Sequence, residues 1–138
     1  MIDPARLSAI PLFDGLAPEQ LALVAEAVEE VEVSPGERIA TQGDFAYEFF
    51  AIEMGTADVE QDGALAATLG PGDFFGELGL LVSGRRTASV IATSPMRILA
   101  MFDQSFRRLE RQIPGFTERV RSEMHDRFTR PRSGTFTG

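Results

Sequence analysis

A carboxylate and an arginine pair lie close together in one short stretch of the sequence. Glu77 stands in the run Phe75–Leu80, and Arg85 and Arg86 follow a short distance later. A carboxylate accepts hydrogen bonds from the hydroxyls of a sugar diol, and a guanidinium holds a phosphate through two parallel charge-assisted bonds. Gly76 lets the backbone come close to a ligand and offer its N–H. These residue types predict a site for a small molecule that carries both hydroxyls and an anionic phosphate.

The length and composition of the chain are those of one globular domain. It has 138 residues, of which 43% are hydrophobic and 25% charged, and it has no cysteine. Disulfides and thiolate metal sites are therefore excluded. No apolar run approaches the roughly 18–20 residues that span a bilayer, and the N-terminus has no secretory pattern, so we expect a cytoplasmic protein without a membrane partner. The formal net charge of −8 argues against nucleic acid as a direct partner. An anionic ligand must then be held locally, by a buried arginine.

Four zones follow one another along the chain. Residues 1–31 are expected to be helical, with one helix opening at Pro18. Residues 32–102 carry short apolar or alternating runs between frequent glycine turns, a pattern typical of a β-sandwich or barrel. Residues 103–130 predict two helices, because apolar residues recur at intervals of three and four. Residues 131–138 are expected to form a flexible tail. Five phenylalanines are expected in the core: Phe45, Phe49, Phe50, Phe74 and Phe102.

Several motifs in the strand-rich zone resemble the cyclic nucleotide-binding domain family. In order, they are Gln42-Gly43-Asp44, Gly55, Gly70–Leu78 and Arg86–Val90. The stretch 76–90 is similar to the phosphate-binding cassette of the family, and most closely to that of hyperpolarisation-activated channels. The resemblance implies a mainly β fold of class α+β, in which N-terminal helices and two C-terminal helices flank an eight-stranded, jelly-roll-like β-roll. All four zones then belong to one domain.

The resemblance also implies how the ligand is held. Glu77 is expected to hydrogen-bond the ribose 2′-hydroxyl and Arg86 to pair with the phosphate, whereas Arg85 faces solvent. Thr87 is a candidate for a hydroxyl contact with the phosphate, or with the guanine amino group of cyclic GMP. Backbone N–H groups are expected from Gly76, Leu78, Gly79 and Ala88. The base is expected to meet apolar walls and a stacking arginine from the last helix: Val59, Ala67, Leu69 and Arg127.

The resulting prediction is a non-catalytic receptor for a cyclic nucleotide, with cyclic AMP as the expected ligand and cyclic GMP as the alternative. Binding is expected to shift the two C-terminal helices and close the last one as a lid. The protein effector would act in trans or lie on a further domain. Three alternatives stay open: the sensor fragment of a helix-turn-helix transcription regulator, a β-roll enzyme of the cupin type, and a degenerate domain used as a protein-docking scaffold. The enzyme is disfavoured because a metal site of that type needs several histidines and the chain has only His125.

Overall fold

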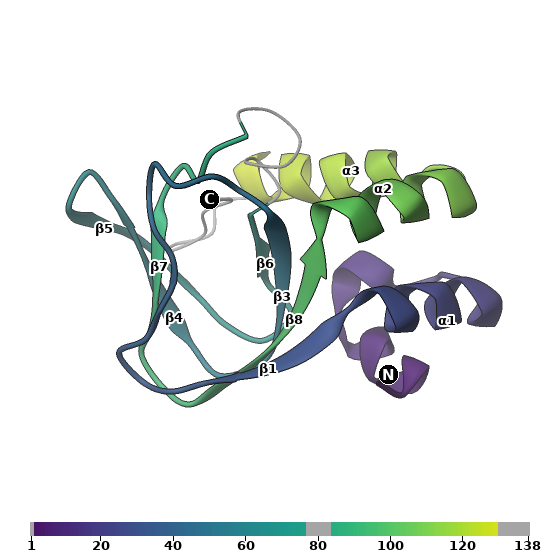
Figure 1. Cartoon of the computed structure of the whole chain (residues 1–138), viewed down its shortest axis with the longest axis horizontal. Helices are drawn as coiled ribbons and strands as arrows, with labels where there is room; N and C mark the ends of the chain where they lie inside the picture. The colour runs from purple at the N-terminus through teal and green to yellow at the C-terminus, as the bar shows by residue number, and fades with distance from the viewer. Residues whose placement is uncertain (1, 77–83, 130–138) are drawn as a thin grey trace.

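Helices lie at both ends of the chain and strands fill the middle (Figure 1). The computed structural model describes residues 2–76 and 84–129, with side chains up to residue 122. Two short 3-10 helices, η1 (Pro4–Ala9) and η2 (Pro11–Phe13), precede α1 (Pro18–Ala27). After the strands come α2 (Asp103–Gln112) and α3 (Phe116–Thr129). No helix in the described part of the chain is long and apolar enough to cross a membrane.

The strands form two antiparallel sheets of four, which face each other as the two walls of a roll (Figure 1). The first sheet has the order β1 (Glu29–Val33), β8 (Met96–Phe102), β3 (Glu48–Met54) and β6 (Phe74–Phe75). The second sheet has the order β2 (Arg38–Ala40), β7 (Ser89–Ala92), β4 (Ala57–Gln61) and β5 (Ala64–Leu69). The predicted eight-stranded roll with helices at both ends is confirmed.

Strand β3 belongs to two hydrophobic cores at once. Side chains alternate between the two faces of a strand. Phe49 and Ala51 accordingly pack with the helices on one side, in a cluster that includes residues of η1, α1, α2 and α3. Phe50 and Ile52 point the other way, into the interior of the roll. The first sheet therefore separates the helices from the interior of the roll, and β3 contacts both.

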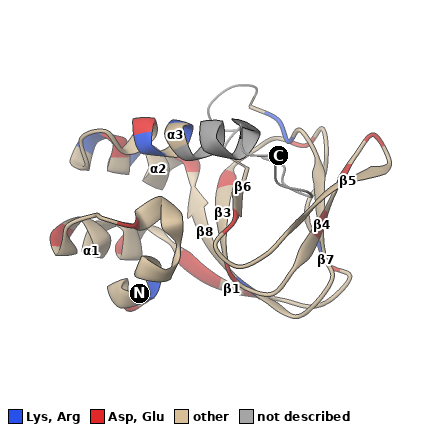
Figure 2. Ribbon diagram, turned by 180° about the vertical axis from the view of Figure 1, so that it is seen from behind, with Lys and Arg blue, Asp and Glu red and all other residues tan. Residues whose placement is uncertain are grey.

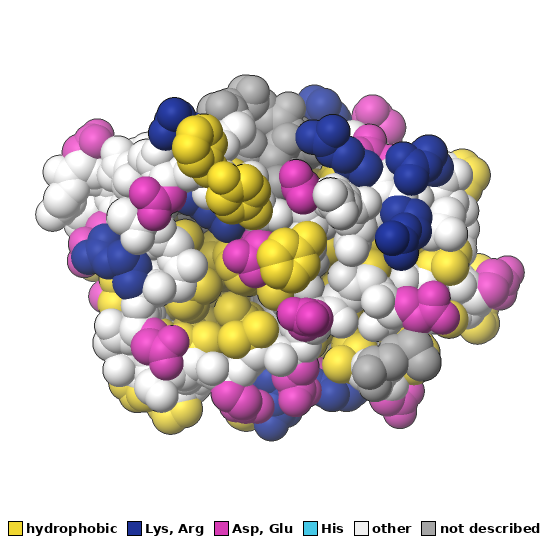
Figure 3. Space-filling view, viewed as in Figure 1, with side chains coloured by type: hydrophobic (Ala, Val, Ile, Leu, Met, Phe, Trp, Pro, Cys, Tyr) yellow, Lys and Arg dark blue, Asp and Glu magenta, His cyan; other side chains and the backbone are white. Residues whose placement is uncertain are grey.

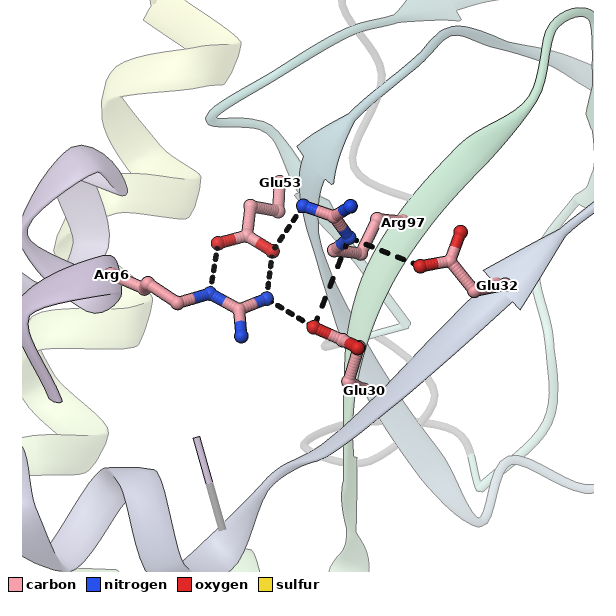
Figure 4. A network of polar contacts seen from close by, with 5 residues as sticks. All are labelled: Arg6, Glu30, Glu32, Glu53 and Arg97. Carbon is pink, nitrogen blue, oxygen red and sulfur yellow. Dashed lines mark hydrogen bonds and ion pairs between the residues drawn. The ribbon is translucent and has the colours of Figure 1, made fainter. Parts of the chain in front are cut away.

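A network of ion pairs ties the N-terminal segment to the first sheet (Figure 4). Arg6 of η1 donates from Nε to Glu53 of β3 at 2.8 Å, and it also pairs with Glu30 of β1. Arg97 of β8 lies on the other side of the same carboxylates and pairs with Glu32 at 3.1 Å. The network thus joins η1 to three neighbouring strands on the edge of the roll.

Two expectations about local structure are wrong. The helical zone was placed at residues 1–31, but β1 already begins at Glu29, where it pairs with Ala100 of β8. Phe45 and Phe102 were expected in the core, but 57% and 44% of their surfaces are exposed. Phe45 lies in the turn before β3, and Phe102 is the last residue of β8, so both are at the rim of the roll.

Candidate functional site

Arg86 is a buried cation at the interior of the roll, with 7% of its surface exposed. Its backbone is held by the turn before β3, because its N–H donates to Asp44 O at 2.8 Å and its carbonyl accepts from Gly43 N–H at 2.9 Å. The guanidinium carbon lies 5.3 Å from the centre of the Phe50 ring. Burying a charge carries a large desolvation cost, which an anion bound beside the buried arginine would offset.

Arg85 differs from its neighbour in its burial. Its side chain is exposed, its guanidinium carbon lies 4.2 Å from the Phe45 ring centre, and its Nη1 donates to Gly43 O at 2.9 Å. Arg85 therefore stacks on the rim of the roll, as expected for the arginine that does not serve the interior.

Gly76 follows β6 and lies against the side chain of Arg86. Its φ of +96° is in the left-handed region that favours glycine. A Cβ atom at this position would lie 2.5 Å from Arg86 Nη1 and 2.8 Å from Glu48 O. The backbone of residue 76 and the guanidinium of Arg86 can approach this closely only because residue 76 has no side chain.

Thr87 and Ala88 continue from Arg86 into β7. The carbonyl of Thr87 accepts a hydrogen bond from Gln61 Nε2 at 3.1 Å. Its hydroxyl is buried and has no hydrogen-bond partner among the residues that the structure describes. Ala88 is buried in the interior cluster of the roll. A buried hydroxyl without a partner costs free energy, and a ligand that bonded it would recover that cost.

The apolar residues predicted beside the base come together on the second sheet. Val59 pairs with Ala67 across β4 and β5 and with Val90 across β4 and β7. Val59, Ala67 and Leu69 are all buried, in the same interior cluster as Phe50 and Ala88. The roll therefore brings together the predicted apolar wall and the neighbourhood of Arg86.

Four predicted site residues are not described at the side-chain level. Glu77, Leu78 and Gly79 lie outside the described residues. Arg127 falls within α3, but its side chain lies outside the described part. Their predicted roles therefore stay predictions.

Phe50 and Phe75 lie close to Arg86. From the sequence, Phe50 was expected only in the core, and Phe75 was given no role. Their rings stack, with centroids 4.8 Å apart and an interplanar angle of 27°. Phe50 also lines a cavity of about 220 Å³ together with seven other residues: Val31, Val33, Glu37, Arg38, Ile39, Glu48 and Ile98. Figure 3 shows a hollow in the surface that is lined with hydrophobic side chains. The alternation of β3 could have identified Phe50, because it shares a strand face with Ile52.

The arrangement suits the binding of a small ligand. It offers a buried guanidinium, a buried hydroxyl and an apolar wall, which together fit a ligand with an anionic end and an apolar body. Among the described residues, no group of three or more His, Cys, Asp or Glu side chains could hold a metal ion.

Comparison with known proteins places the same residues in one family. Residues 30–112 match the family described as "Cyclic nucleotide-binding domain". The cAMP-dependent protein kinase regulatory subunit of Hypocrea atroviridis is 33% identical over 115 residues, which make up 83% of this chain and 25% of that protein. The chain therefore spans only a quarter of the length of this curated relative.

Two solved structures extend the comparison to the fold. The crystal structure of the Thermus thermophilus catabolite activator protein has a TM-score of 0.78 and 31% identity, and covers 86% of this chain and 58% of that one. The regulatory subunit of a cAMP-independent protein kinase A from Trypanosoma brucei has a TM-score of 0.79 and 22% identity, and covers 92% of this chain and 44% of that one. The second likeness is one of fold alone.

Proposed function

Because the chain belongs to the cyclic nucleotide-binding domain family, we propose that it is a receptor module for a cyclic nucleotide, with cyclic AMP as its ligand. The observation that carries the proposal is the buried guanidinium of Arg86, which lies beside the apolar interior of the roll. Cyclic GMP is the alternative ligand, because the Thr87 hydroxyl can serve either nucleotide.

In the proposed binding mode, different residues contact the phosphate, the ribose and the base of the ligand. Arg86 pairs with the cyclic phosphate, and the Thr87 hydroxyl and the N–H groups of Gly76, Leu78, Gly79 and Ala88 supply further hydrogen bonds. Glu77 accepts a hydrogen bond from the ribose 2′-hydroxyl. The base lies against apolar side chains, and Arg127 stacks on it from α3. The apolar side chains are those of Val59, Ala67 and Leu69.

The proposed output is a change in the two C-terminal helices. The ring of Phe106 in α2 has its centroid 6.1 Å from that of Phe49 in β3 and 5.5 Å from that of Phe116 in α3. A movement of β3 would therefore reach both helices through packed aromatic rings. Ligand can shift the helices only as far as its affinities for the two arrangements differ. The effector is proposed to be a protein in trans or a further domain.

A second candidate is a domain whose pocket is unused and which serves as a docking scaffold. It is considered because a protein of the same fold, at 22% identity, is described as the regulatory subunit of a cAMP-independent protein kinase A. The fold alone therefore does not decide the ligand, and a binding measurement is needed.

Isothermal titration of the purified chain with cyclic AMP, and then with cyclic GMP, tests the proposal. Arg86→Ala is expected to weaken binding roughly a hundredfold or more, because a buried charge on the ligand loses its partner. Arg85→Ala is the matched control and is expected to change affinity less than about fivefold, since the side chain is exposed. If neither nucleotide gives heat or a thermal shift, the scaffold is the better account. Equal affinities of the two variants would contradict the role of Arg86.

A further inference from the structure

We propose that Phe50 and Phe75 form an aromatic platform that positions the guanidinium of Arg86 for anion binding. The identity of the anion as a cyclic nucleotide rests on the proposed function, whereas the platform itself rests on the geometry of Phe50, Phe75 and Arg86. Phe50 is thus a positioning residue: it acts through Arg86.

The platform is built from two strands of the first sheet. Phe50 of β3 and Phe75 of β6 are direct partners in the antiparallel pairing of these strands. Their rings stack with centroids 4.8 Å apart, and 4% and 1% of their surfaces are exposed. Two buried rings that support each other have little freedom to rotate, so the face that Phe50 presents is fixed.

Arg86 lies over that face. Its guanidinium carbon is 5.3 Å from the Phe50 ring centre, within the distance at which a cation is attracted to an aromatic face. A guanidinium is planar and can stack on a ring while its N–H groups stay directed to the side. The contact therefore restrains the orientation of the guanidinium.

Gly76 lies against the guanidinium of Arg86 on a further side. A Cβ atom there would lie only 2.5 Å from Arg86 Nη1, so a side chain at residue 76 would clash with the guanidinium. Phe75 and Gly76 are consecutive, and one short segment thus supplies both the second ring and the wall. A side chain held in this way loses less conformational entropy on binding than one free to rotate, which increases affinity.

Strand β3 offers an internal control. Phe49 and Phe50 are neighbours, both buried, and Phe49 points to the helices instead of the roll interior. Phe49→Leu and Phe50→Leu are therefore the same chemical change on opposite faces of one strand. Phe50→Tyr keeps the ring and adds only a hydroxyl group at its edge.

The first experiment measures the affinity for cyclic AMP of these three variants and of the wild type, at a temperature where circular dichroism finds all four folded. We expect Phe50→Leu to raise the Kd about tenfold, and Phe49→Leu and Phe50→Tyr to stay within about threefold of the wild type. Equal Kd values for Phe49→Leu and Phe50→Leu would overturn the platform.

The second experiment needs no ligand. The Nε–H resonance of Arg86, assigned with Arg86→Lys, is followed by NMR in the free wild type and in the same variants. We expect a ring-current shift in the wild type, in Phe49→Leu and in Phe50→Tyr, and its loss in Phe50→Leu. An unchanged resonance in Phe50→Leu would also overturn the platform. If the wild type binds neither nucleotide, the proposed function fails, and the resonance still decides on the platform.

Discussion

At the scale of single residues, the buried hydroxyl of Thr87 connects stability and binding. It has no hydrogen-bond partner among the described residues, so the fold carries its desolvation cost. We expect Thr87→Val to leave the free energy of unfolding unchanged or raise it by up to about 1 kcal/mol in the free protein. The same change should weaken cyclic AMP binding by about five- to tenfold, because the ligand loses one hydrogen bond. Urea denaturation and titration calorimetry measure the two effects.

Thr117 of α3 provides the matched control for this prediction. Its hydroxyl is also buried and without a partner among the described residues, but it lies away from the roll interior. Thr117→Val should therefore have a similar effect on unfolding and no effect on affinity. A loss of stability in Thr87→Val with unchanged affinity would mean that the hydroxyl serves the fold and not the ligand.

The burial of some single residues could be predicted from the sequence, and that of others could not. The order Arg86-Thr87-Ala88 correctly predicted Arg86 as the buried arginine and Arg85 as the exposed one. Phe45 was expected in the core because of its residue type alone. The structure uses it at the rim, where it stacks with Arg85. Residue type does not reveal on which side of a turn a side chain lies, since that depends on contacts between segments far apart in the sequence.

At the scale of elements, β3 and the aromatic rings behind it form the connection between the roll and the helices. Phe106→Leu removes the ring between Phe49 and Phe116 while keeping most of the apolar volume, so it should destabilise the fold by about 1 kcal/mol. In the wild type, cyclic AMP should slow amide hydrogen exchange in α3. In Phe106→Leu that slowing should be lost, although the affinity changes less than about threefold.

The control for this uncoupling is Met101→Leu, a conservative change in the same buried cluster but on β8. It should preserve both the affinity and the slower exchange of α3. Equal slowing in Phe106→Leu and the wild type would show that ligand reaches α3 by another route, or that α3 does not respond through its packing.

Helices in which apolar residues recur at regular intervals could be predicted from the sequence. A strand that forms only by pairing with a distant segment could not. The intervals of three and four around Pro114 predicted both C-terminal helices, which are present as α2 and α3. The start of β1 was missed. Glu29, Glu30 and Val31 are exposed and continue the helical spacing of the preceding residues, and only their pairing with β8 makes them a strand. A strand whose partner lies some 70 residues further along the chain has little local signature.

At the scale of the whole molecule, the chain is acidic but its charges are unevenly placed. Figure 2 shows acidic residues along much of β1, whereas basic and acidic residues are mixed on the helix pair α2 and α3. With a net charge of −8, the molecule as a whole repels an anionic ligand. Recognition of a cyclic phosphate must then depend on short-range contacts, which is consistent with the burial of Arg86 inside the roll.

The ion pairs between Arg6, Glu53 and Arg97 should contribute to the stability of the fold in a way that depends on pH. The hydrogen bond from Arg6 holds the pKa of Glu53 below its usual range, and the charges of Arg6 and Arg97 act in the same direction. A folded-state pKa below the unfolded value contributes stability that is complete above the unfolded pKa and is lost as the pH falls through the folded one. The attachment of η1 to the first sheet should therefore weaken in acid.

We expect Glu53→Gln to lower the melting temperature by roughly 2–5 °C at pH 7. The gap between the variant and the wild type should narrow as the pH falls below about 4, because protonated Glu53 resembles glutamine. Glu26→Gln, an exposed change on α1 without an ion pair among the described residues, controls for the general loss of negative charge. Thermal melts from pH 7 to pH 3 measure all three proteins. A gap that stays constant over this range, or that Glu26→Gln reproduces, would mean that the network does not stabilise the fold through the charge of Glu53.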